Sequence, residues 1–362
     1  MAEINKIVNK KTERNSNIEL LRILVTLFVI ILHYNNANNG KAFSYTQNIL
    51  PANYQFLLLF EMFAICAVNV FVLISGYFMC NSKKADVTKI LRLYFDVIFF
   101  SVFRYVLLCM LKRRSFSVSN LISNMIPLNW YVAVYTSLYL ISPYLNKIIR
   151  GMKEKRFRTM LLILILVFSV WPSALEFITF QTGKKLTSLN PISIQGSTAG
   201  YSIVNFVVLY MFGAYIRQHY NDKRDFKTAL VSLLIYVFSS ILLTVYANTY
   251  FSGAVSYCNP FVILQSVSLF KAFQCLNIKS KLINSLASCS FAVYLMHSFF
   301  FSYAKIEQYV TGRLRMILVH IIASSIIIYL LSAIIYKIYF FISNPVLTWC
   351  QKKLSFLTYE VE

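Results

Sequence analysis

Charged residues are scarce in this sequence, and acidic residues are the scarcest of them. Only 13% of the 362 residues are charged, with 13 Asp and Glu against 35 Lys and Arg. A soluble domain carries about twice that charged fraction, whereas hydrophobic residues make up 58% of this chain and its mean hydropathy is +0.62. The composition therefore excludes an ordinary soluble enzyme and predicts a membrane protein. We attribute the net charge of +22 to basic loops that face the cytoplasm and anionic membrane lipids, and we expect no nucleic-acid partner.

Clustered cysteines and long polar segments are also missing. Seven cysteines are scattered through the chain without a CxxC pair or a Cys/His cluster, so neither a disulfide framework nor a metal site is predicted. The longest polar connection, TFQTGKKLTSLNPISIQGSTAG, is too short to fold as a domain of its own. Any chemistry must therefore be built from helix ends and from the interior of a helix bundle.

What the sequence does contain is a series of long apolar runs separated by short polar loops. Together they predict an all-α, polytopic membrane helix bundle of about ten transmembrane helices. We divide the chain into a cytoplasmic N-terminal segment 1–17, a transmembrane domain 18–342 and a cytoplasmic tail 343–362. The predicted spans are 18–37, 53–79, 90–111, 128–145, 159–178, 200–216, 228–246, 259–276, 286–304 and 314–342.

Lysine and arginine indicate the orientation of these spans. If the N-terminus is cytoplasmic, the predicted inside segments hold far more basic residues than the outside loops, which is the usual bias of cytoplasmic loops. Both termini are therefore expected on the cytoplasmic side. The cluster of Lys112, Arg113 and Arg114 disagrees with this orientation, because it falls in a predicted outside loop.

Two polar residues interrupt the first apolar run. Arg22 and His33 are separated by three helical turns and about 20°, so both lie on one stripe of the helix. The rise of about 16 Å between them places Arg22 near the cytoplasmic rim and His33 past the centre of the bilayer. An ionisable group at that depth normally faces a bundle interior or a cavity. In the functional interpretation, Arg22 is a cation at the rim of a site and His33 is a proton-transfer group deep inside it. In the structural alternative, Arg22 extends its charge to the membrane surface and His33 is packed at the end of the helix.

Three further polar groups belong to the same neighbourhood in this interpretation. Glu19 lies one turn before Arg22 and can pair with it. Glu61, in the second span, reaches a depth similar to that of His33, and its carboxylate could orient the imidazole. His297 falls within a late span and either contacts a ligand or is packed and hydrogen-bonded.

The third span carries charges at two depths. Lys89 and Arg92 open it at the cytoplasmic rim, where together with Arg22 they could bind a phosphorylated ligand, although simple positive-inside flanking explains them equally well. Deeper in the same helix, Asp96 and Arg104 lie on roughly one face, and we expect them to pair with each other.

Five segments carry recognisable motifs. NIELLRILVTLFVIILHY has an Arg-x10-His spacing, VNVFVLISGYFM ends in Ser-Gly-aromatic, and KILRLYF is a Lys-x-x-Arg variant of an Arg-x-x-Arg element. NWYVAVYTSLYLISPYLNKII is a Trp-Tyr-rich helix that reaches a proline, and SFAVYLMHSFFF contains Tyr-x-x-His. In this order the five segments resemble the acyltransferase 3 family of integral membrane acyltransferases.

The resemblance implies that an acyl group, usually acetyl from acetyl-CoA, moves from the cytoplasmic side to a hydroxyl of a surface or secreted polysaccharide. It implies His33 as a general base or a transient acyl carrier, with Glu61 as its predicted partner in catalysis. Lysine at position 89 lacks the bidentate geometry of arginine toward a phosphate, so donor affinity could differ. The expected donor-binding residues are Glu19, Arg22, Lys89 and Arg92, and the expected substrate-binding residues are Ser75, Tyr77, Trp130, Tyr131, Tyr294 and His297.

We therefore expect an O-acetyltransferase of a bacterial cell membrane that uses acyl-CoA and a polysaccharide acceptor. No esterase-like domain follows the bundle, so direct transfer to the glycan is the simpler expectation. Two alternatives stay open. The chain is a glycan exporter of the same family, or it has only an assembly role. The acceptor sugar and the oligomeric state are not readable from the sequence.

Overall fold

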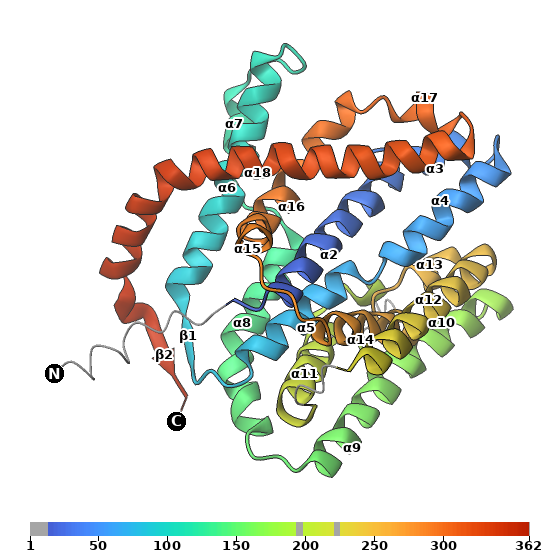
Figure 1. Ribbon diagram of the computed structural model, residues 1–362, viewed down its shortest axis with the longest axis vertical. Helices are drawn as coiled ribbons and strands as arrows, with labels where there is room; N and C mark the ends of the chain where they lie inside the picture. The colour runs from blue at the N-terminus through green and yellow to red at the C-terminus, as the bar shows by residue number, and fades with distance from the viewer. Residues whose placement is uncertain (1–13, 193–197, 221–224, 362) are drawn as a thin grey trace.

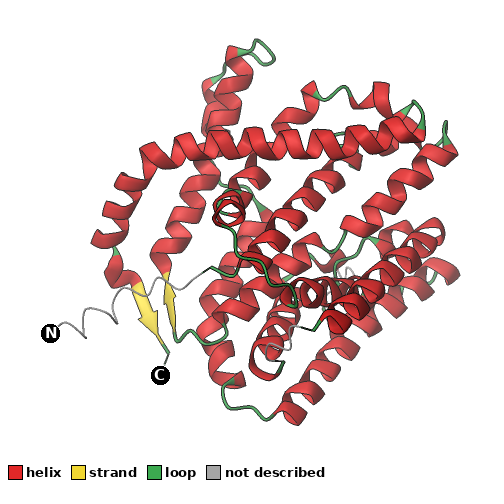
Figure 2. Ribbon diagram, viewed as in Figure 1, coloured by secondary structure: helices red, strands yellow, loops and turns green. Residues whose placement is uncertain are grey.

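The structure is a computed structural model, and it describes residues 14–192, 198–220 and 225–361. This part of the chain is almost entirely helical, with one pair of short antiparallel strands (Figures 1 and 2). The predicted all-α bundle is therefore confirmed.

Helices follow one another along the described chain with short connections. The first half contains α2 (Ser16–Asn35), α3 (Ala42–Thr46), α4 (Pro51–Ala64), α5 (Ala67–Met79), β1 (Lys84–Asp86), α6 (Val87–Met110), α7 (Val118–Met125), α8 (Trp130–Ile149), α9 (Glu154–Ile165), the π-helical turn η1 (Leu166–Val170) and α10 (Trp171–Thr182). The second half contains α11 (Ile203–His219), α12 (Phe226–Thr249), α13 (Phe251–Ala254), α14 (Pro260–Gln274), α15 (Lys281–Ala287), α16 (Ser290–Phe300), α17 (Ile306–Val310), α18 (Leu314–Lys353) and β2 (Thr358–Glu360). Short 3-10 turns lie at Thr187–Leu189, Thr198–Gly200, Phe301–Tyr303 and Ser355–Leu357.

Six helices of the described chain are long and apolar enough to cross a membrane, or seven if the bent pair α15–α16 forms one span. Two of the six are composite, because α4 continues into α5 and α9 continues through η1 into α10. The three other predicted spans fall on α8, α11 and α14. Of these, α11 has 17 residues and α14 has 15, which is short for a full span. The predicted count of ten is thus not confirmed.

Helix α2 lies inside the bundle. It packs against α4, α5, α14, α15, α16 and α18, and its apolar residues Leu21, Val25 and Ile30 are fully buried. The side chain of Asn15 accepts a hydrogen bond from the Asn17 N–H and so caps the start of the helix. The 59° bend between α15 and α16 then lets α16 run beside α2. Helix α16, which is distant from α2 in the sequence, therefore packs against the face of α2 that carries the predicted polar residues.

Two glycines allow α5 and α11 to pack backbone against backbone. A Cβ at Gly76 would lie 2.1 Å from the Tyr210 carbonyl oxygen, and a Cβ at Gly213 would lie 2.2 Å from the Leu73 carbonyl oxygen. Neither contact leaves room for a methyl group, and small residues at such crossings are the usual means of bringing membrane helices close together. Gly76 of the Ser-Gly-aromatic motif therefore has a packing role.

The two strands join the C-terminal tail to the loop between α5 and α6. Strand β1 pairs antiparallel with β2, and Lys84 forms an ion pair with Glu360 at 3.0 Å. Helix α18 runs past the predicted tail boundary at residue 342 and ends at Lys353. Figure 1 shows this sheet at the lower left and helices α3 and α17 at the upper right. The tail and the α5–α6 loop therefore lie on the same side of the bundle, as the predicted topology requires.

Replacing Gly76 by alanine should destabilise the bundle. The added methyl group would overlap the Tyr210 carbonyl, and overpacking of this kind costs about 1–3 kcal/mol. Thermal unfolding of the full chain in detergent measures the loss. Gly312→Ala is the control, because the nearest atom to its added Cβ is 3.3 Å away. Equal unfolding temperatures for G76A and G312A would contradict this view of the α5–α11 contact.

Candidate functional site

Two histidines from distant helices meet inside the bundle. The ring of His33 on α2 lies 4.6 Å, centroid to centroid, from the ring of His297 on α16, at an interplanar angle of 66°. His33 Nδ1 lies 2.9 Å from the Val29 carbonyl oxygen, and His297 Nδ1 lies 2.7 Å from the Tyr294 carbonyl oxygen. A carbonyl can only accept a hydrogen bond, so each Nδ1 carries the hydrogen in the neutral ring. Each Nε2 is left with its lone pair.

The histidine pair is mostly buried: His33 is partly exposed and His297 is buried. His297 is 4% exposed, and its Nε2 has no hydrogen-bond partner in the described structure. A buried polar atom without a partner is uncommon in proteins, and this one lies on a ring that lines a cavity. The Nε2 atoms are thus free to accept a proton or to act as nucleophiles.

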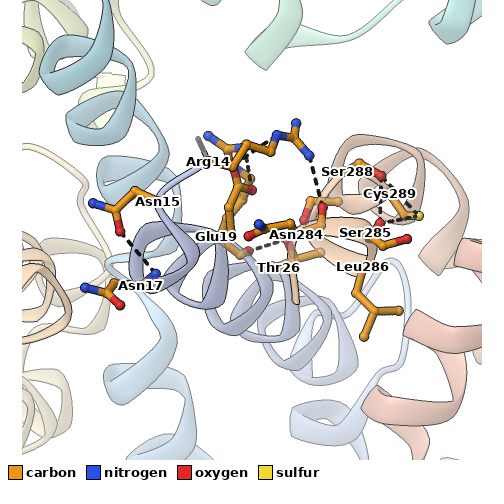
Figure 3. A network of polar contacts seen from close by, with 12 residues as sticks. Arg14, Asn15, Asn17, Glu19, Thr26, Asn284, Ser285, Leu286, Ser288 and Cys289 are labelled. Carbon is orange, nitrogen blue, oxygen red and sulfur yellow. Dashed lines mark hydrogen bonds and ion pairs between the residues drawn. The ribbon is translucent and has the colours of Figure 1, made fainter. Parts of the chain in front are cut away.

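The predicted ion pair at the start of α2 is present. Arg22 Nη1 lies 3.0 Å from Glu19 Oε2 and 3.2 Å from Glu19 Oε1. Arg14 Nε approaches the same carboxylate at 3.7 Å, while Arg14 Nη1 donates to the Asn284 carbonyl oxygen at 3.0 Å. Figure 3 shows Arg14 between Glu19 and the segment that carries Asn284. Two guanidinium groups therefore share one carboxylate, and this end of the bundle keeps a net positive charge.

A cavity of about 300 Å³, the inner cavity, begins at Arg14 and Arg22, which together form the arginine rim. It extends along α2 to Val29, the residue whose carbonyl holds the His33 ring. Its walls come from α2, α5, α6, α8, α15 and α16, so it lies between the helices. The lining residues are Arg14, Arg22, Val29, Val68, Phe71, Ile74, Ser75, Leu93, Tyr131, Tyr135, Ala287, Ser288, Ser290, Phe291 and Tyr294.

A second cavity, the histidine cavity, has a volume of about 180 Å³ and is lined by His297 together with Asn129, Arg104 and Tyr294. Tyr294 lines both cavities, so the two are neighbours. Its hydroxyl donates to Asn129 Oδ1 at 3.1 Å, and the same oxygen caps α8 by accepting from the Val132 N–H. A single tyrosine, held by the residue that caps α8, thus borders both the inner cavity and the histidine cavity.

Comparison with known proteins identifies the family. The family model described as an acyltransferase domain, acyltransferase 3, matches residues 15–337. The chain belongs to this family. No curated protein and no solved structure shows a significant match to it. The matched range includes Arg22, both histidines and every lining residue of the two cavities except Arg14, so this membrane acyltransferase keeps nearly all of its polar interior within the family domain.

The predicted donor residues of the acyltransferase divide into two groups. Arg22 and its partner Glu19 lie at the mouth of the inner cavity, as described above. Lys89 is exposed, and Arg92 donates to Asn344 Oδ1 at 3.1 Å and lies over the Phe340 ring of α18 at 5.6 Å. Neither of them lines the inner cavity, to which α6 contributes Leu93. Arg14 lines it instead, and no sequence pattern indicated this because Arg14 lies before the first apolar run.

Glu61 does not contact His33. Glu61 Oε2 accepts a hydrogen bond from Asn35 Nδ2 at 2.9 Å, and His33 Nδ1 is taken by the Val29 carbonyl. Asn35 is two residues beyond His33, so the helix turns its side chain to a different face. Glu61 and His33 were predicted at a similar depth, but Glu61 contacts a different face of α2 from the one that carries His33. The predicted pairing of Glu61 with His33 is therefore wrong. The carboxylate joins α4 to the end of α2.

The predicted substrate-binding residues do not form one site: some line the inner cavity, one lines the histidine cavity and two line neither. Ser75, Tyr131 and Tyr294 line the inner cavity, and His297 lines the histidine cavity. Tyr77 is turned away from both cavities, because its hydroxyl accepts hydrogen bonds from Arg217 at 3.2 Å and from Gln274 at 3.4 Å. Trp130 packs against Tyr201 at 4.4 Å and Tyr257 at 6.2 Å and lines neither cavity.

Asp96 and Arg104 do not pair with each other, contrary to the sequence prediction. The Tyr339 hydroxyl donates to Asp96 Oδ1, and Arg104 Nη1 donates to Ser298 Oγ at 3.0 Å. Eight helical residues separate the two by about 12 Å, which is too far for direct pairing. Arg104 instead lines the histidine cavity.

Because Glu61 has no contact with His33, Glu61→Gln should keep acyl-transfer activity. The glutamine retains an oxygen that accepts from Asn35. Glu61→Leu should instead destabilise the chain by about 1–3 kcal/mol, because the buried Asn35 amide loses its acceptor. Activity in membrane preparations and thermal unfolding in detergent measure the two effects. A large loss of activity in E61Q at an unchanged unfolding temperature would contradict the structural role.

Proposed function

We propose that the chain is an O-acetyltransferase of a bacterial cell membrane. It would take acetyl from acetyl-CoA on the cytoplasmic side and transfer it to a hydroxyl of a cell-surface or secreted polysaccharide. The observation that carries the proposal is the inner cavity, which leads from paired arginines to a tyrosine beside two histidines with unprotonated Nε2 atoms. Family membership supports acyl transfer, and the arginines and histidines supply the means for it.

The arginine rim suits a phosphorylated donor. Guanidinium groups form paired hydrogen bonds with phosphate oxygens, and among the residues that the structure describes Arg14 and Arg22 share one carboxylate, that of Glu19. The walls beyond the rim are apolar and aromatic, with Val68, Phe71 and Ile74 on one side. A long, thin and weakly polar acyl-bearing arm fits such a channel better than a sugar does. Acetyl-CoA would supply the thioester, and these residues would hold its head and its arm.

The two histidines account for the proton transfers. One Nε2 takes the proton of the acceptor hydroxyl while that oxygen bonds to the acyl carbon. The bond between the acyl carbon and sulfur breaks, and the imidazolium returns the proton to the departing thiolate sulfur. The backbone hydrogen bond at each Nδ1 fixes the tautomer that this step needs. The second imidazole lies close enough to orient the acceptor or to relay the proton. General-base catalysis accounts for both proton movements without a covalent acyl-histidine.

Removing either histidine should abolish acetylation of the polysaccharide. Loss of a general base typically lowers a rate by about 10²–10⁴-fold. His33→Ala and His297→Ala are introduced into cells that lack the native gene, and base-labile acetyl on the isolated surface polysaccharide is quantified. His219→Gln is the control, because that ring packs against Phe157 and Tyr215, away from both cavities.

The same experiment distinguishes an enzyme from a glycan exporter. An acetyltransferase predicts normal amounts of surface polysaccharide that lack acetyl in the two alanine variants. An exporter predicts less polysaccharide at the surface with its acetyl content unchanged. Full acetylation in H33A, with the variant present in the membrane at wild-type level, would contradict the proposal.

A further inference from the structure

Three arginines line a third cavity, the outer cavity, at the end of the bundle opposite the arginine rim. Its volume is about 510 Å³, and Arg104 lies at the end of α6 while Arg113 and Arg114 lie in the loop that follows. Asn39 and Asn124 contribute amide groups to the same wall. In the part of the chain that the structure describes, no carboxylate lies within 4.0 Å of these arginines.

Contacts anchor Arg104, Arg113 and the loop that follows α6. The Tyr105 hydroxyl donates to the Ser117 carbonyl at 3.0 Å and accepts from the Ser117 N–H at 2.8 Å, which ties the loop back onto α6. The Arg113 guanidinium lies over the Tyr303 ring, 5.6 Å from its centroid. Arg104 donates to Ser298 at 3.0 Å. The positive charge is therefore concentrated at one position.

This charge runs against the general rule for membrane proteins. Arginines are depleted from outside loops, and three like charges around one cavity repel one another unless an anion compensates them. Arginine presents a planar fork of donors that matches the oxygens of a carboxylate or phosphate. The outer cavity thus has the composition of an oxyanion site.

The outer cavity adjoins the reacting centre. Arg104 and Ser298 line both the outer cavity and the histidine cavity, and Ser298 directly follows His297 in α16. Beyond it lies a more open hollow of about 830 Å³ that shares Asn39, Ser298 and Ser302 with the outer cavity. It is formed by the α2–α3 loop, α3, the 3-10 turn η4 (Phe301–Tyr303) and α17. A long molecule that enters there would pass the arginines before it reached the histidines.

We propose that the outer cavity binds an anionic group of the acceptor, so that the acceptor is an acidic polysaccharide bearing carboxylate or phosphate. This inference rests on the proposed function, because it names the substrate class of that same site. The arginines bind a charged unit of the polymer, and a hydroxyl near that unit then reaches the histidine cavity. Specificity for acidic glycans follows from the loop after α6.

Direct binding tests the proposal without any acyl transfer. The full-length protein is reconstituted in nanodiscs of phosphatidylcholine, and fragments of the surface polysaccharide from the same cells are titrated onto it. The fragments are used untreated, after reduction of their carboxylates to alcohols, and after cleavage of their phosphodiesters by hydrofluoric acid. The two chemical treatments distinguish a carboxylate from a phosphate as the bound group.

The variant is the double substitution Arg113→Gln and Arg114→Gln, which changes two exposed side chains. Lys112→Gln is the control, because it removes one positive charge from the same loop but does not line the cavity. Untreated fragments should bind the wild type and K112Q equally and the double variant about 10–100-fold more weakly, as expected for lost charge-assisted hydrogen bonds. One of the two chemical treatments should weaken binding to the wild type by a similar factor.

Three results would overturn the inference. The wild type binds no fragment, or neither the treatments nor the double variant alters binding, or replacement of phosphatidylcholine by phosphatidylglycerol blocks glycan binding in the wild type only. The last result would assign the arginines to an anionic lipid headgroup. Failure of the proposed function shows separately, as unchanged polysaccharide acetylation in His33→Ala cells.

Discussion

The contact between the imidazole rings of His33 and His297 is the constraint on which the rest of the site depends. Two ionisable side chains inside a membrane bundle are costly, and such groups persist where they pair with each other or line a functional cavity. Here each ring gives its Nδ1 hydrogen to a carbonyl of its own helix. The helices α2 and α16 therefore fix both rings before any substrate binds, and the Nε2 atoms stay available.

Positive charge at both ends of the bundle extends this arrangement. Arg14 and Arg22 lie at one end of a row of cavities, and Arg104, Arg113 and Arg114 lie at the other. Tyr294 and His297 lie between the two groups. An enzyme that joins a phosphorylated donor on one side to an acceptor on the other needs a site that both can reach.

The sequence was most informative about features that depend on a single helix. Helical periodicity placed Arg22 and His33 on one stripe, and both face polar features of the same interior. The composition correctly predicted an all-α membrane bundle. The depth of a residue in the membrane was much less informative, because depth does not show in which direction around the helix axis the side chain points. Glu61 lies near the depth of His33 but contacts Asn35, and Asp96 and Arg104 share a helix but bond to different partners.

Contacts between distant helices could not be predicted from local pattern. Nothing in the sequence around His297 indicates that its ring meets His33, and Arg14 lies outside every apolar run. One overlooked residue did carry a signal. Asn129 stands directly before a helix, the usual place for a capping residue, and in the structure that cap also holds the Tyr294 hydroxyl. The disagreement of Lys112, Arg113 and Arg114 with the positive-inside rule was a second signal, and the structure shows that Arg113 and Arg114 line a cavity.

The most direct test of a cooperating histidine pair is a double-mutant cycle. Acetyl transfer from acetyl-CoA would be measured as kcat/KM for the wild type, His33→Asn, His297→Asn and the double variant in the same membrane preparation. If the rings act as one unit, the double variant will be no slower than the slower single variant, because removing either ring already disables the pair. Losses that multiply, so that the double variant falls by the product of the two single effects, would show that the histidines act independently and would contradict the account.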